Sequence, residues 1–203
     1  MRIEYIRQFI KEKAVQFGAK TESFSLRDNT EISFNTNTPG AYLGLVEFEE
    51  VTSGPYHDFS LVLFPSDNEA KQIIVSLGIG PPGFKNDYNL ATFPGLRRYF
   101  SKLIDNKGYC KIDFSDIESS LPKKFIDSIY SDFLKRSIQK YKEVLPVCQI
   151  VDEPESEAGK KIITAFVAGY AKLRDWPSNK DHRNAISEAL EPFLKTEAID
   201  EAL

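Results

Sequence analysis

An acid at position 58 and a Glu-x-Lys triplet eleven residues later have the composition of a metal-dependent nuclease site. In such sites two carboxylates hold Mg²⁺ and a lysine orients the attacking water. Asp58 and Glu69-Ala-Lys71 match that order, but the chemistry requires the triplet to lie within a strand, beside the first acid. Glu69 instead follows Pro, Ser, Asp and Asn, which are residues that form turns. A Mg²⁺-dependent nuclease is therefore the second alternative, since solvated turn charges explain the same residues.

A loop rich in glycine and proline, Gly78-Ile-Gly-Pro-Pro-Gly83, invites comparison with phosphate-binding loops. Nucleotide-binding loops place a lysine and a hydroxyl residue directly after the last glycine, at the start of a helix whose N–H groups hold phosphate. Here Phe84 precedes Lys85, and Asn86 stands at the hydroxyl position. The two prolines also remove N–H donors from the loop. We expect a rigid surface loop and no nucleotide or other cofactor.

The histidines and cysteines do not have the spacing of a catalytic or metal site. His57 and His182 are the only candidate bases for a nucleophile, and no serine lies in a G-x-S-x-G turn. Cys110 and Cys148 are far apart and do not form the paired short spacings of a zinc site. We therefore expect a non-enzymatic protein without a metal, with both cysteines reduced.

Basic residues are concentrated in the middle of an otherwise acidic chain. Residues 97–142 contain 11 Lys and Arg against 6 Asp and Glu, whereas the segments on either side are acidic and bring the net charge of the whole chain to −4. Aromatic residues occur on the predicted strands that precede this block. Aromatic rings stack on bases, and Lys and Arg neutralise phosphates. This combination favours binding of a nucleic acid.

The apolar spacing predicts an α+β fold with a mainly antiparallel sheet or partly open barrel, flanked by helices. Residues 1–146 would form a recognition domain. Residues 147–203 would be an acidic linker, up to residue 159, and a helical extension packing on that domain. The expected elements are a helix over 3–17, a hairpin over 22–34 with its turn at 27–30, strands over 41–51, 58–64, 71–77 and 109–114, and helices over 94–104, 120–146, 162–173 and 185–194.

The order of these elements resembles the N-terminal specificity module of McrB-type, modification-dependent restriction NTPases. The resemblance covers residues 1–145 and is carried by the first helix, the strand Ala41-Tyr-Leu-Gly-Leu45, the hairpin from Leu61 to Ile79 and the helix Leu96-Arg-Arg-Tyr-Phe100. It implies a module that recognises a methylated base, typically flipped into an aromatic pocket, and that is tethered to an AAA+ motor. The motor's Walker A motif is missing here, and the only tryptophan, Trp176, is far from the pocket strand.

We therefore expect a DNA-binding specificity module for modified or foreign DNA in a restriction or phage-defence system, with an AAA+ NTPase motor as partner in cis or in trans. The first alternative is a protein-interaction or sensor domain that docks a partner subunit. Without a signal peptide or an apolar membrane span, the expected location is the cytoplasm. The expected base pocket is Tyr42, Leu43, Phe48 and Tyr56, and the expected phosphate contacts are Arg97, Arg98, Lys102, Lys123 and Lys124.

Overall fold

The computed structural model describes residues 3–20, 24–28, 43–47, 52–53, 56–57, 59–66, 71–79, 99–111, 121–142 and 145–194. Within these ranges six strands form one antiparallel sheet in the order β1-β2-β5-β6-β8-β7, and β3 and β4 form a separate pair. The strands are β1 (Phe24–Asp28), β2 (Leu43–Glu47), β3 (Thr52–Ser53), β4 (Tyr56–His57), β5 (Phe59–Pro65), β6 (Ile73–Ile79), β7 (Gly108–Cys110) and β8 (Val147–Val151). The helices are α1 (Ile3–Gln16), α5 (Lys123–Asp127), α6 (Asp132–Tyr141), α7 (Glu157–Leu173) and α8 (Lys180–Leu194).

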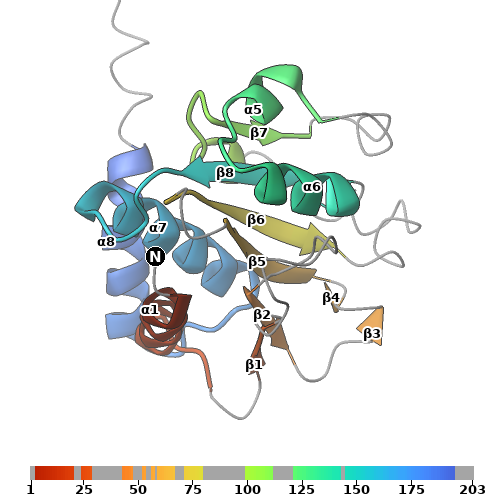
Figure 1. Ribbon diagram of the computed structural model, residues 1–203. Coiled ribbons are helices and arrows are strands. Elements are labelled where there is room, and N and C mark those ends of the chain that lie inside the picture. Colours follow the sequence, from red (N-terminus) through yellow and green to blue (C-terminus); the bar gives the residue numbers. More distant parts are fainter. Residues whose placement is uncertain are drawn as a thin grey trace, which may run out of the picture.

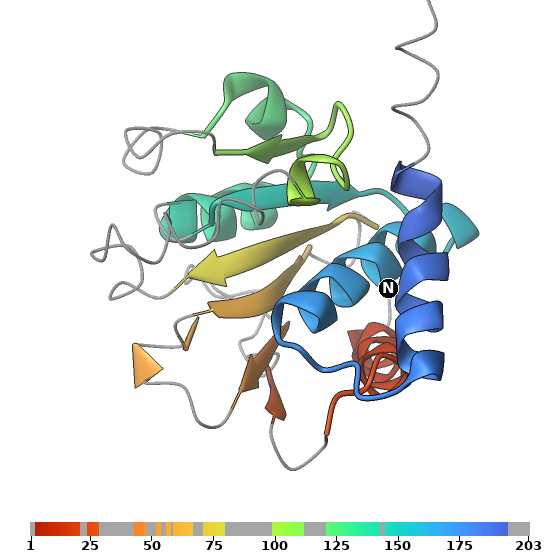
Figure 2. The ribbon, with the colours of Figure 1, turned by 180° about the vertical axis from the view of Figure 1, so that it is seen from behind.

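Helices cover both faces of the sheet, which gives three layers (Figure 1, and from behind in Figure 2). Leu61 and Leu63 of β5 point into a core shared with α1, α7 and α8. Val62 and Phe64, the alternate residues of the same strand, point into a second core shared with α5 and α6. A strand buried on both faces is apolar at every position. The predicted α+β class with an antiparallel sheet is thus confirmed, and the sheet is open, with β1 and β7 at its edges.

The predicted hairpin at the centre of the sheet is confirmed. β5 pairs with β6 from Phe59 opposite Ile79 to Pro65 opposite Ile73. β6 continues two residues further than expected, because Gly78 and Ile79 still pair with β5. Residues 80–83, the rest of the glycine and proline loop, lie outside the described part of the chain.

Several predicted element boundaries are wrong. α7 begins at Glu157 and α8 at Lys180, each five residues before its predicted start. Arg27 and Asp28, expected in a turn, continue β1 and pair with Gly44 and Leu43 of β2. The single helix expected over 120–146 is two helices, because the Ser131 hydroxyl accepts a hydrogen bond from the Leu134 N–H at 3.2 Å and begins α6 as its N-cap.

The predicted division at residue 146 is also wrong. Residues 147–151, expected to begin an acidic linker, form β8, which pairs with β6 on one side and β7 on the other. All five residues of β8 are buried. The acidic segment begins only at Asp152, and α7 behind it packs into the same core as α1. Residues 147–194 are therefore part of the domain and not an extension of it.

Among the helices just described, none combines the length and the apolar character that crossing a membrane requires.

Candidate nucleic-acid interface

The residues predicted to form the base pocket are only partly described. Leu43 begins β2 and Tyr56 begins β4, and these two strands lie against each other. The backbone thus brings two of the predicted pocket positions onto neighbouring strands, with their side chains outside the described part of the chain. The other two predicted pocket residues, Tyr42 and Phe48, lie outside the described part of the chain. The same holds for Arg97 and Arg98, two of the predicted phosphate contacts.

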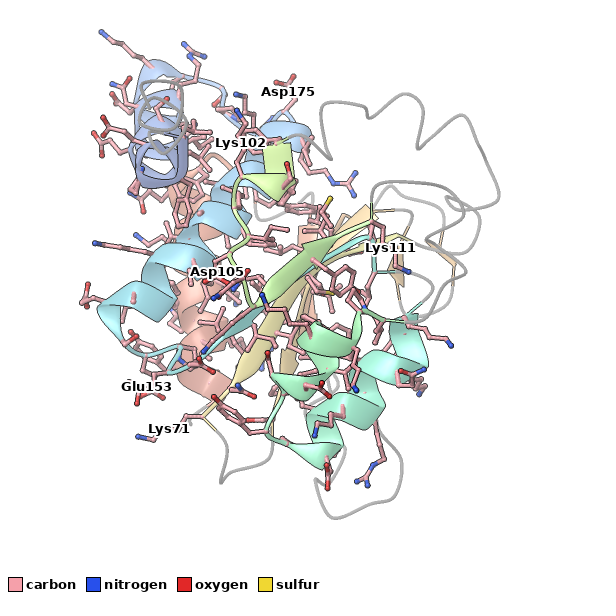
Figure 3. All side chains as sticks on the ribbon, turned by 90° about the horizontal axis from the view of Figure 1, so that it is seen from above. Lys71, Lys102, Asp105, Lys111, Glu153 and Asp175 are labelled. Atoms are coloured by element: carbon pink, nitrogen blue, oxygen red, sulfur yellow. The ribbon has the colours of Figure 1, made fainter. Side chains whose placement is uncertain are left out.

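The three described lysines of the predicted phosphate contacts lie in different layers. Lys102 follows a helical turn whose Phe100 is buried in the core beneath α1, α7 and α8, and Figure 3 shows Lys102 on the side of α7 and α8. Lys123 and Lys124 lie on α5, whose Phe125 is buried in the core on the other face. The sheet therefore separates Lys102 from the two lysines of α5, and the predicted set is not one surface.

The layer formed by α5 and α6 is the basic part of the described structure. Residues 121–142 carry six Lys and Arg and two Asp, a net charge of +4. The opposite layer is nearly balanced, since residues 3–20 and 145–194 together carry ten basic and ten acidic residues and Lys102 adds one further cation. We call the five cations of α5 and α6, together with Lys142 directly after α6, the basic face; they are Lys123, Lys124, Lys135, Arg136, Lys140 and Lys142.

Helix geometry explains why these cations point outward. On α6 the side chains of Leu134 and Ile138 are buried in the core against the sheet, and Phe133 is buried as well. Arg136 and Lys140 lie one turn apart on the other side of the helix and are exposed. Neither residue was among the predicted phosphate contacts, although both belong to the basic block. Their spacing relative to the apolar stripe of α6 is the signal in the sequence that identifies them.

No family model, curated protein or solved structure matches this chain. The resemblance to McrB-type modules therefore stays a prediction.

A buried glutamine attaches the basic face to the sheet. Gln72, which precedes β6, donates from Nε2 to the carbonyl oxygen of Ser128 at 3.1 Å and to Oδ1 of Asp152 at 2.7 Å. Its Oε1 accepts from the backbone N–H of Tyr130 at 2.9 Å. Both Ser128 and Tyr130 lie in the connection between α5 and α6. One side chain thus fixes that connection to the sheet and to the end of β8.

A buried lysine holds the far end of α6. Lys111 is only 6 % exposed, and its ammonium group donates to the carbonyl oxygen of Lys142 at 2.8 Å, just past the last turn of α6. A cation at this position satisfies a free carbonyl and the negative end of the helix dipole. Lys111, although it lies within the basic block, therefore has a structural role and does not reach the surface where phosphates would bind.

The ion pair between Lys107 and Asp152 lies beside Gln72 at the end of β8. Burial raises the pKa of Asp152, but the hydrogen bonds from Lys107 and Gln72 outweigh it and hold that pKa below its ordinary value. The hydrogen bond to Asp152 and the charge of that carboxylate raise the pKa of Lys107. Both side chains are more than one third exposed, so solvent screens the pair.

We expect this pair to make stability dependent on pH on the acid side. Because the pKa of Asp152 is lower in the folded state, its contribution is present above the unfolded value of about 3.9 and is lost as the pH falls through the folded value. Urea unfolding of the wild type and of Asp152→Asn should therefore show a stability difference at neutral pH that shrinks on acidification below pH about 4. A difference that stays constant with pH would contradict the role of the charge.

The two cysteines face opposite sides of the sheet. Tyr109 of β7 is directly opposite Cys148 of β8, so Cys110 points to the other face. Neither cysteine is in a disulfide within the described residues, and burial raises the pKa of Cys148 to about 12. A thiol with this pKa is protonated at neutral pH and is a poor nucleophile.

The residues of the nuclease alternative are not brought together within the described structure. Lys71 is exposed just before β6, on the same side of the molecule as Glu153 (Figure 3), whereas Asp58 and Glu69 lie outside the described residues. Over the described part of the chain, no group of three or more His, Cys, Asp or Glu side chains is placed to hold a metal ion.

Proposed function

We propose that this chain binds DNA through its basic face and serves as the recognition module of a restriction or phage-defence system. The observation that supports the proposal is the concentration of positive charge. Six cations and two acids lie on the two helices of one layer and directly after α6, while the opposite layer is nearly neutral. Cations on one face can neutralise several neighbouring phosphates at once, which supplies affinity without reading sequence.

Recognition of a modified base is the finer part of the proposal. It depends on the strands β2 and β4, whose first residues are Leu43 and Tyr56, and on the resemblance described above. In this proposal the chain reads DNA and carries no catalytic residue of its own. An AAA+ motor, in cis or in trans, supplies the hydrolysis of nucleotide.

The decisive experiment removes charge from one layer at a time and measures DNA affinity against salt. The test variant combines Lys123→Gln, Lys124→Gln, Arg136→Gln and Lys140→Gln, four exposed residues of the basic face. The matched control combines Lys11→Gln, Lys13→Gln, Lys161→Gln and Lys180→Gln in the opposite layer, which changes the net charge by the same amount. Fluorescence anisotropy with a labelled duplex, methylated or unmethylated, gives the affinities.

We expect the slope of log affinity against log salt to become shallower by about 3.6 in the test variant, since each phosphate contact contributes about 0.9. At a salt concentration fourfold above the lowest, wild-type affinity should fall by at least about a hundredfold. The control should retain the wild-type slope. Equal losses in both variants, or a wild-type affinity independent of salt, would overturn the proposal. Equal affinity for the two duplexes would overturn only the recognition of methylation.

A further inference from the structure

An exposed aromatic residue, Tyr130, lies in the connection between α5 and α6, on the layer that carries the basic face (Figure 1). Its side chain is 69 % exposed, more than any other large apolar side chain in the described part of the chain. Tyrosine presents a large flat surface to a binding partner and is enriched where proteins make contacts. The core does not use this ring, so its face is available to a ligand.

The backbone on both sides of the ring is fixed. Ile129 is 1 % exposed and Ser131 is 4 % exposed, so Tyr130 is the one residue of the three that faces solvent. Its N–H donates to Oε1 of the buried Gln72 at 2.9 Å, and Ser131 begins α6 as the N-cap. An aromatic side chain on a fixed backbone loses little conformational entropy when it binds. Tyr130 is thus a platform prepared for a flat ligand.

The charges next to the ring disfavour a phosphate at that point. Asp127 is three residues before Tyr130 and Asp132 is two residues after it. The carboxylate of Asp132 is paired with Lys135 at 3.8 Å. Because like charges repel, a phosphate close to these acids is less favourable than an uncharged group. The face of the ring is therefore suited to a neutral, planar group such as a nucleic-acid base.

Exposed cations precede and follow the ring along the chain. Lys123 and Lys124 lie before it on α5, and Arg136 and Lys140 lie after it on α6. A DNA strand whose phosphates contact both groups of cations brings one of its bases to Tyr130. Cations that hold phosphates and an aromatic ring that stacks on a base are together typical of proteins that bind unpaired nucleotides.

Tyr130 is separate from the predicted base pocket. It is bound to Gln72, directly before Ile73 at the start of β6. Tyr56 of the predicted pocket directly precedes the start of β5, whose Phe59 pairs with Ile79 at the other end of β6. The seven residues of β6 span about 20 Å. The two positions therefore lie at opposite ends of the same strand.

We infer that Tyr130 stacks on an unpaired base of the bound DNA, so that the ligand of the basic face is DNA with at least one base outside the duplex stack. In a duplex each internal base is stacked on both sides by its neighbours and offers no free face. An unpaired base offers such a face, and stacking on an aromatic ring is tolerant of sequence. The inference rests on the proposed function, since the same strand places its phosphates on the basic face.

The inference is tested by removing the ring and comparing two forms of DNA. In fluorescence anisotropy at fixed salt, Tyr130→Ala should bind a labelled single strand about 5- to 150-fold more weakly than the wild type. It should bind the duplex of the same strand as the wild type does. Tyr130→Phe keeps an aromatic face and should restore the affinity for the single strand. Tyr5→Ala, which removes an exposed tyrosine of α1 in the opposite layer, is the control and should change neither affinity.

Photocrosslinking identifies the stacked residue independently of affinity. A single strand that carries 5-iododeoxyuridine crosslinks on irradiation to an aromatic side chain stacked against that base, and mass spectrometry of the peptides locates the crosslink. We expect it at Tyr130.

Two results would overturn the inference and leave the proposed function standing. One is a Tyr130→Ala variant that loses no affinity for the single strand or loses it equally for the duplex, because the ring then does not read an unpaired base. The other is a crosslink only at other aromatic residues. A wild type that binds neither form of DNA in a salt-dependent manner overturns the proposed function, and the inference with it.

Discussion

A chain that ends at Pro146 should not fold. The truncation removes β8, which is hydrogen-bonded to β6 and to β7, and it removes α7 and α8 from the larger core. Ile163, Phe166, Val167 and Tyr170 of α7 are each 1 % exposed or less. Burial of these four side chains alone contributes about 6–12 kcal/mol, which is comparable to the net stability of a domain, about 5–15 kcal/mol.

Thermal and urea unfolding followed by circular dichroism would test this expectation. Residues 1–146 should show no cooperative transition, whereas a chain that ends at Leu194 keeps every described element and should unfold cooperatively, like the full chain. A cooperative transition in residues 1–146 would contradict the single domain and support a boundary between residues 146 and 147.

Replacing Gln72 by leucine should lower the free energy of unfolding by about 3 kcal/mol. The substitution nearly preserves the volume of the buried side chain but removes all three of its hydrogen bonds. The carbonyl oxygen of Ser128 and the N–H of Tyr130 then lose their partner in the sheet, and Asp152 loses one of its two donors. The connection between α5 and α6, and with it the basic face, should become the first part of the chain to open.

Urea denaturation gives the loss of stability, and hydrogen exchange of the α5 and α6 amides shows where the chain opens. Lys71→Leu is the matched control, because Lys71 is the neighbouring residue and is exposed. This control should change stability by no more than about 0.5 kcal/mol. A Gln72→Leu variant as stable as the control would show that the three hydrogen bonds do not hold the layer to the sheet.

The central hairpin and the amphipathic helices could be predicted because their signals are local. Residues 58–64 and 71–77 are apolar runs separated by turn formers, and the apolar stripes of α1 and α7 repeat at three- and four-residue steps. β8 could not be recognised in the same way. Its five residues stand directly before an acidic segment, and a strand this short is defined by the two strands that it joins.

The candidate site was predictable in composition but not in geometry. The excess of Lys and Arg over Asp and Glu in residues 97–142 can be counted in the sequence. It predicts phosphate contacts, among them Lys123 and Lys124. Which face each cation occupies depends on where its helix begins. A single helix was expected from Ser120, and it hid the short apolar stripe of α6 after Ser131, which places Arg136 and Lys140 on the outward side. The position of Lys102 in the other layer depends on the packing of Phe100 against α7, which no local pattern encodes.

The place of β8 within the sheet has a consequence for the growing chain on the ribosome. In the β6–β8 pair, Ile73 is opposite Val151, 78 residues later in the sequence. Until Val151 has emerged, β6 has an unpaired edge along an apolar strand, and such edges are sites of aggregation. Pairing of β6 with β8 also closes a loop of 78 residues between Ile73 and Val151, and closure of a loop this long slows folding. We expect the nascent chain to depend on chaperones until β8 has emerged from the ribosome.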